Sequence, residues 1–301
     1  MTSPQASETN PLLFRAGQPE DQPQIAEMIR DIWEGNDYLA KVWNRWAQTP
    51  NSLLRVALLG DEIVATGRVV EQVPGGWWLE GVRVHPAYQG RGFASQLHHH
   101  LVELAFEQPG IKCLGMTTTA DTQAMAHLAE RTEMALRAEY RYVRGSALPE
   151  TPGGVLSHTP TNQAALLADL QQGAWLTASS GYAMNAWVAR PLDADWLGEI
   201  VATGGVWRRG GAVALAGRGS YGTEHWLYLL EGGSEQDREM IVRHLRYLAY
   251  QESPEALLRC FVPQGAAALL PPLLDAGMQD PEGKPFYLHH FVREQPVTDE
   301  R

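Results

Sequence analysis

The spacing of apolar and polar residues predicts an ordered series of strands and helices in the first half of the chain. Alternating apolar and polar positions are typical of half-buried strands, whereas apolar positions three or four residues apart are typical of helices. The predicted order is strand, two helices, three strands, helix, strand, helix and strand. The predicted strands are 12–16, 54–59, 63–73, 79–84, 113–118 and 140–145. The first predicted helix follows Pro19, the second spans 38–46, the third starts at Phe93 and the fourth spans 122–134.

A stretch rich in proline, glycine and small polar residues, 149–160, predicts a linker after this first half. Beyond it the order of elements partly repeats. The predicted helices are 162–172, 238–251 and a segment through 278, and the predicted strands are 211–216, 224–232, 257–263 and 286–294. Because 301 residues exceed one average domain, we predict a first domain over 1–148 and a second over 161–301.

A glycine-rich turn lies between the predicted strand 79–84 and the predicted helix that starts at Phe93. Pro86 ends the strand, and Gly90 and Gly92 can adopt positive φ, which lets the backbone approach a ligand. The first N–H groups of a helix lack partners within it, and its dipole favours negative charge. The turn therefore predicts a pyrophosphate site, to which Gln89 and Arg91 can add donors.

The spacing of this turn excludes two common nucleotide motifs. No Gly-Lys-Ser/Thr follows it, as a Walker motif requires, and Gly90, Gly92 and Ser95 do not meet the Rossmann spacing. The segment instead resembles the acetyl-coenzyme A arm of the GNAT acyltransferases, and a structural turn that binds nothing is the alternative. The resemblance implies that acetyl-CoA is held by the backbone or side chains of Val82, Arg83, Val84, Gln89, Gly90, Arg91, Gly92, Phe93, Ala94 and Ser95.

The same resemblance implies the fold class. The order of elements in both halves matches tandem GNAT folds of the α/β (α+β) class, each with a central mixed, mostly antiparallel sheet flanked by helices. Within the family, the segments Asp37-Tyr38-Leu39, GRVV before Glu71, and LEGVRVHP resemble the N-acetyltransferase 16 and histidine N-acetyltransferase group. That likeness implies acetyl transfer to the amine of a free amino acid, without fixing which one.

Three positions are the candidate catalytic and substrate residues. Glu80, on the central strand, is the candidate general base acting through water; pairing with a nearby arginine is the alternative. Asp37 and Tyr38 lie in the segment that shapes the acceptor pocket in this fold and could hold an ammonium group. Helix capping is an equal alternative for Asp37.

The sequence departs from the family at the usual acid, a tyrosine on the helix after the fifth strand. Ala129 stands in its place, and Glu133 replaces a family glycine. Tyr140, Tyr142 or water could protonate the leaving thiolate instead, although both tyrosines also suit a packed strand. This departure keeps a non-catalytic acyl-CoA sensor open as an alternative to an enzyme.

The second half lacks the glycine arm. Its counterpart, EGGSEQDR at 231–238, carries three carboxylates that would repel a pyrophosphate. We therefore predict a degenerate copy that walls the substrate pocket or makes a homodimer contact, with acyl-CoA binding of its own as the alternative.

The composition of the chain argues against several classes of binding partner. The net charge of −11 argues against nucleic acid and anionic membranes. Two cysteines give no disulfide framework, and His98, His99 and His100 diverge by about 100° each on a helix, so no metal is expected. Without a signal peptide or a long apolar run, a cytoplasmic location is expected.

These patterns together predict an acetyl-CoA-dependent N-acetyltransferase. The expected acceptor is a small amine, above all a free amino acid, that attacks the thioester directly in a ternary complex. A protein or peptide N-acetyltransferase is the remaining alternative.

Overall fold

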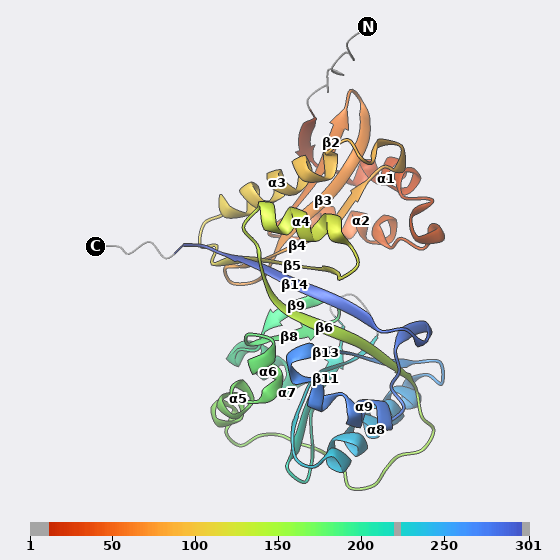
Figure 1. Ribbon diagram of the computed structural model, residues 1–301, viewed down its shortest axis with the longest axis vertical. Helices are drawn as coiled ribbons and strands as arrows, with labels where there is room; N and C mark the ends of the chain where they lie inside the picture. Colours follow the sequence, from red (N-terminus) through yellow and green to blue (C-terminus); the bar gives the residue numbers. More distant parts are fainter. Residues whose placement is uncertain (1–11, 220–223, 297–301) are drawn as a thin grey trace, which may run out of the picture. The chain divides into compact units, whose positions relative to one another are not determined.

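The computed structural model describes residues 12–219 and 224–296 (Figure 1). Contacts divide the chain into two compact units. The first comprises Met1–Gly115, Leu128–Met134 and Arg293–Arg301, and the second comprises Met116–His127 and Ala135–Val292. The domain boundaries at residues 148 and 161 stay a prediction.

The first unit is built on a mixed sheet with the strand order β1-β2-β3-β4-β5. Neighbouring strands are antiparallel except β4 and β5, which are parallel. The strands are β1 (Leu13–Ala16), β2 (Ser52–Leu59), β3 (Glu62–Val73), β4 (Gly76–Val84) and β5 (Cys113–Thr119). All five were predicted, and β4 begins earlier than expected because Trp77 and Trp78 are core residues, 6% and 4% exposed.

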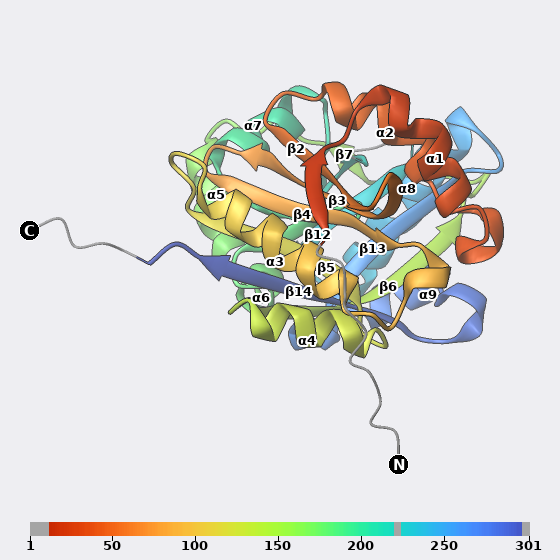
Figure 2. The same cartoon turned by 90° about the horizontal axis from the view of Figure 1, so that it is seen from above.

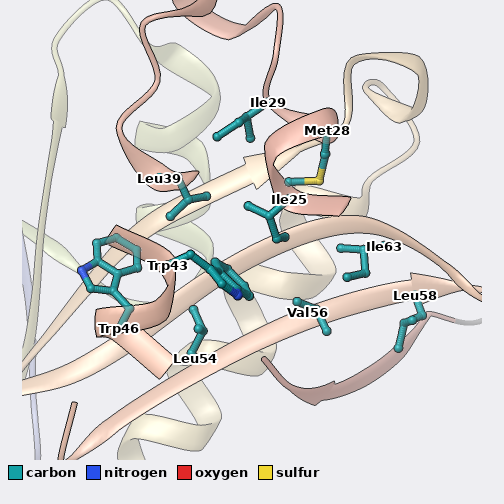
Figure 3. Packing of buried hydrophobic residues seen from close by; sticks show 10 residues of the cluster. All are labelled: Ile25, Met28, Ile29, Leu39, Trp43, Trp46, Leu54, Val56, Leu58 and Ile63. Carbon is teal, nitrogen blue, oxygen red and sulfur yellow. The ribbon is translucent and has the colours of Figure 1, made fainter. Parts of the chain in front are cut away.

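Helices α1 and α2 lie on one face of strands β2–β4, and α3 lies on the other (Figures 1 and 2). The core between α1, α2 and the sheet is formed largely by aliphatic side chains around Trp43 and Trp46 (Figure 3). Burial of each such large apolar side chain stabilises the fold by about 1.5–3 kcal/mol. The helical elements are η1 (Pro19–Asp21), α1 (Gln22–Met28), η2 (Ile32–Gly35), α2 (Leu39–Gln48), η3 (Pro86–Tyr88), α3 (Phe93–Phe106) and α4 (Gln123–Arg131).

The second unit has a sheet of the same kind, with the order β7-β10-β11-β12-β13-β6-β14. All its neighbours are antiparallel except β12 and β13, which are parallel. Its strands are β6 (Ala135–Ser146), β7 (Leu156–Ser157), β10 (Val206–Arg209), β11 (Ala212–Arg218), β12 (His225–Gly232), β13 (Leu257–Pro263) and β14 (Phe286–Glu294).

The other elements of the second half include several that the apolar pattern did not predict. Among these are helices α6 and α7, the short strand β7 inside the predicted linker, and a separate hairpin of β8 and β9. Their bounds, with those of the remaining helices, are α5 (Gln163–Gln171), α6 (Ala174–Ala178), β8 (Tyr182–Asn185), β9 (Val188–Pro191), α7 (Ala194–Ala202), α8 (Glu235–Glu252), η4 (Gln264–Leu269), α9 (Pro271–Asp275) and η5 (Pro281–Gly283).

The two units repeat one arrangement. In each, a strand that is antiparallel to one neighbour and parallel to the other leads through glycines into a long helix, as β4 leads into α3 and β12 into α8. Both strands also shift register against their antiparallel neighbour. The predicted fold class, two mixed and mostly antiparallel sheets flanked by helices, is confirmed.

Candidate active site

A bulge in β4 marks the centre of the candidate site. Thr66 and Arg68 of β3 pair with Arg83 and Glu80 of β4, so three steps along β4 oppose two along β3. Gly81 lies within the bulge at φ +69°, and a Cβ there would approach the Trp46 ring to 2.6 Å. Both the backbone angle and the space therefore require glycine.

The edge of β4 that faces β5 is open beyond Trp78. In the described chain, the β4–β5 register comprises Gly76, Trp77 and Trp78 only. The N–H of His85 donates to Val64 O of β3 at 2.9 Å. Because successive residues of a strand point their N–H groups to opposite edges, the N–H of Val84 faces the open edge. A ligand that extends along β4 can bond to this backbone.

The glycine arm follows directly. Gly90 and Gly92 adopt φ +76° and +78°, and a Cβ on either would meet nothing within 4 Å. Gly92 is the N-cap of α3 and supplies no side-chain cap to the N–H groups of the first turn. Gln89 and Arg91 are exposed beside it, and Phe93 is buried and anchors the helix. The arm presents exposed backbone donors, as an anion site requires.

Glu80 is paired with Arg68, the arrangement that was the alternative to a free base. Arg68 Nε donates to Glu80 Oε1 at 2.7 Å, and the side chains are 3% and 11% exposed. The Arg68 guanidinium also lies 3.8 Å from the ring centroid of Trp46. The Glu80 carboxylate is therefore held in one orientation at the bulge.

Asp37 and Tyr38 lie on the α2 side of β4. Asp37 accepts hydrogen bonds from Arg83 Nε at 2.6 Å and from the N–H of Leu39 at 2.9 Å, so it does act as a helix cap. Tyr38 is 40% exposed and meets Trp46 edge to face, 6.0 Å between ring centroids. Partial burial, with Glu80 nearby, raises the pKa of Tyr38 to about 12, so its hydroxyl stays protonated at neutral pH.

The positions linked to the missing acid are all packed. Ala129 is fully buried in α4, and Tyr140 and Tyr142 are 0% and 7% exposed in β6. Tyr142 packs against Phe261, with 5.0 Å between ring centroids. Burial raises the pKa of both tyrosines, which therefore act as core residues of the second unit.

The three consecutive histidines contact different partners. His98 Nε2 lies 3.0 Å from Thr132 Oγ1, His99 pairs with Glu103 at 3.1 Å, and His100 stacks on Phe14 with centroids 4.4 Å apart. Within residues 12–219 and 224–296, no cluster of three or more His, Cys, Asp or Glu side chains could hold a metal ion.

The counterpart of the arm in the second unit is occupied by the protein's own groups. Ser234 caps α8 by accepting from the N–H of Asp237 at 3.1 Å, and the Asp237 carboxylate accepts in return from the N–H of Ser234. Arg238 Nη1 donates to Gly232 O at 2.7 Å, and Glu231 accepts from the N–H of Trp175 at 2.9 Å. These contacts favour the degenerate interpretation of this copy.

Arg68 and Trp46 were missed as site residues. Arg68 stands inside the run EIVATGRVV, in which almost every side chain is buried. A charge in such a run needs a buried partner, since burying an unpaired charge is strongly unfavourable. That signal could have predicted a carboxylate on the neighbouring strand.

Known proteins share sequence features with the first half of this chain. Residues 22–133 match the model of the Acetyltransferase (GNAT) family. The chain is similar to a histidine N-acetyltransferase of Scomber australasicus, 25% identical over 230 residues, which are 66% of this chain and 68% of the relative. It is also similar to a histidine N-acetyltransferase of Oreochromis niloticus, 31% identical over 116 residues, 38% of this chain and 34% of the relative.

Two solved structures share the fold along almost the whole chain. A GCN5-related N-acetyltransferase from Sphaerobacter thermophilus has a TM-score of 0.64 and 14% identity, covering 96% of this chain and 97% of its own. A tandem GNAT protein from the clavulanic acid biosynthesis pathway has a TM-score of 0.57 and 14% identity, covering 96% of this chain and 100% of its own.

Residues 22–133 therefore match the GNAT acetyltransferase family, and the chain has the fold of a tandem GNAT protein. The protein is an acyltransferase. Among the residues that the structure describes, no helix is both long and apolar enough to cross a membrane. The cytoplasmic location and the homodimer contact stay predictions.

Proposed function

We propose that the protein transfers an acetyl group from acetyl-CoA to the amine of a small molecule, with a free amino acid as acceptor. One observation carries the proposal: the arm at 89–92 presents unshielded backbone donors directly after a strand with an open edge. The arm suits the pyrophosphate and the open edge of β4 suits the extended pantetheine chain. Acetyl-CoA supplies the thioester whose carbonyl carbon is attacked.

The proposed chemistry is a direct displacement in a ternary complex. The acceptor nitrogen forms a bond to the thioester carbon while the bond from that carbon to sulfur breaks, and coenzyme A leaves as a thiolate. The N–H of Val84, with that of Val82, polarises the thioester carbonyl. Glu80 takes the proton of the acceptor through water, and a second water protonates the thiolate in place of the absent tyrosine.

A free amino acid suits a modest base. An α-amine with a pKa of about 8 is roughly one tenth deprotonated at neutral pH, whereas a lysine side chain near 10.4 is less than about one thousandth free. The Glu80 carboxylate is already bound by Arg68, and it is better suited to deprotonating an α-amine than a lysine side chain. The two relatives named histidine N-acetyltransferase make histidine the first acceptor to test.

The experiment is thiol release from acetyl-CoA with a panel of free amino acids, polyamines, aminoglycosides and peptides. We expect turnover on one or a few amino acids. Turnover on peptides alone would support the protein or peptide alternative. No turnover on any amine, with acetyl-CoA still raising the melting temperature, would support an acyl-CoA sensor and contradict the proposal.

A further inference from the structure

The loop before α2 is exposed except at one residue. Glu34, Gly35, Asn36 and Tyr38 are exposed, whereas Asp37 is buried. The Asp37 side chain is only 1% exposed. A buried carboxylate in an exposed polar loop needs compensation for its lost hydration, so its partners decide where the loop lies.

Both oxygens of Asp37 are bound by the protein itself. Oδ1 accepts from the N–H of Leu39, the first residue of α2, and Oδ2 accepts from Arg83 Nε. An acceptor ammonium could reach this carboxylate only by displacing one of these donors. The geometry therefore argues against Asp37 as the group that binds the acceptor directly.

Arg83 links the loop to the reactive part of β4. Its Nη1 donates to Val82 O at 3.0 Å, within the bulge, while its Nε holds Asp37. Its guanidinium carbon lies 5.7 Å from the ring centroid of Tyr38. The side chain thus runs from β4 toward the loop, and a role of the Arg83 backbone in binding the cofactor stays a prediction.

We propose that Arg83 and Asp37 are positioning residues, which hold Tyr38 beside the β4 bulge so that Tyr38 contacts the acceptor. This inference rests on the proposed function. Without Arg83, the buried charge of Asp37 keeps only the N–H of Leu39 as a partner, and the exposed loop relieves the lost ion pair by leaving the surface of β4. Tyr38 is then displaced, and the acceptor loses its contact while the glycine arm is untouched.

A double-mutant cycle tests this directly. We expect Asp37→Asn and Arg83→Gln each to raise the acceptor KM about tenfold, and the double variant to raise it no further, because both substitutions break the same contact. Arg83→Lys should restore part of the loss, and the acetyl-CoA KM should stay within about twofold throughout. Direct binding by Asp37 would instead make Asp37→Asn severe and Arg83→Gln nearly silent, which would overturn the proposal.

Amide hydrogen exchange gives a readout that does not depend on activity. Arg83→Gln should speed exchange in residues 34–39, with the N–H of Leu39 most affected, and leave the start of α3 unchanged. Arg15→Gln is the matched control, because it breaks another Arg–Asp pair of the same unit, with Asp21, at 2.7 Å. It should change neither the acceptor KM nor exchange in this loop.

The two proposals fail separately. If no amine is acetylated but Arg83→Gln speeds exchange in the loop, the loop contact stands and the proposed acceptor class is wrong. If amino acids are acetylated and Arg83→Gln changes neither the acceptor KM nor loop exchange, the positioning role is wrong.

Discussion

Arg68 and Glu80 face each other across β3 and β4, with Arg68 Nε 2.7 Å from Glu80 Oε1. Because the guanidinium is also stacked on Trp46, the carboxylate has one well-defined orientation at the bulge. A buried ion pair of this kind adds little net stability, but loss of one partner leaves the other charge unpaired. We infer that Arg68 orients the carboxylate of Glu80, the candidate base.

Glu80→Gln should lower turnover by about 100-fold at neutral pH, because the amide can still accept from Arg68 but cannot take up a proton. The loss should shrink as pH rises and the acceptor deprotonates by itself. The pH dependence of kcat/KM measures both effects. Glu71→Gln is the control: Glu71 bonds Asn51 and the N–H of Gly75 and has no proposed role. An unchanged pH profile in Glu80→Gln would remove Glu80 from this role.

Gly90→Ala should weaken acetyl-CoA binding about tenfold or more while leaving the fold nearly intact. The added methyl meets no protein atom, so the cost to folding is that of the positive φ, about 1 kcal/mol. Gly60→Ala is a matched control, since Gly60 has φ +64° and open space in the β2–β3 turn. Calorimetric titration with acetyl-CoA distinguishes them, and equal affinity in both variants would exclude the arm from cofactor binding.

Glu133→Gly should raise the stability of the first unit by about 1 kcal/mol, or the melting temperature by about 2–4 °C. Glu133 adopts φ +59° at the end of α4, where Met134 N donates to Ala129 O and Glu133 N to Glu130 O. This is a Schellman motif, in which glycine is favoured. The exposed pair with Arg293 that is lost contributes little. A lower melting temperature for Glu133→Gly than for wild type would contradict this account.

His98 should make the protein sensitive to acid. Thr132 Oγ1 donates to Leu128 O, so it accepts from His98 Nε2 and leaves the buried His98 Nδ1 unprotonated. Burial, with His99 nearby, lowers the pKa of His98 from 6.5 to about 4. The contribution of neutral His98 to the free energy of unfolding is therefore fully present above pH 6.5. It is lost, by up to about 3 kcal/mol, as pH falls toward 4.

Urea unfolding at pH 7.5 and pH 4.5 tests this in wild type and in His98→Gln, whose amide can still donate to Thr132. The variant should lose less stability on acidification. His225 and His290, whose pKa values are also lowered, affect both proteins alike, so the difference isolates His98. An equal loss in the two proteins would refute the assignment.

The sequence predicted those parts of the site that depend on local backbone chemistry. Pro86, Gly90 and Gly92 restrict φ within a few residues of one another, so the turn and the start of α3 were predictable without knowledge of the rest of the fold. The strands of the first unit were predictable for a similar reason, since their alternation is local.

The contacts that orient side chains in the candidate site were not predictable in the same way. Arg68 meets Glu80, and Asp37 meets Arg83, only once the register of β3 and β4 and the path of the α2 loop are known. The bulge at Gly81 shifts that register by one residue, which no apolar pattern reveals. The β8–β9 hairpin, whose strands have four residues each, is likewise too short for a periodic signal.

Thiol release from acetyl-CoA with single free amino acids, histidine first, measures the proposed acetyl transfer itself. We expect turnover on an amino acid, with loss of that turnover in Glu80→Gln and normal turnover in Glu71→Gln. Absence of turnover with every amine in the panel, in a protein that still binds acetyl-CoA, would contradict it.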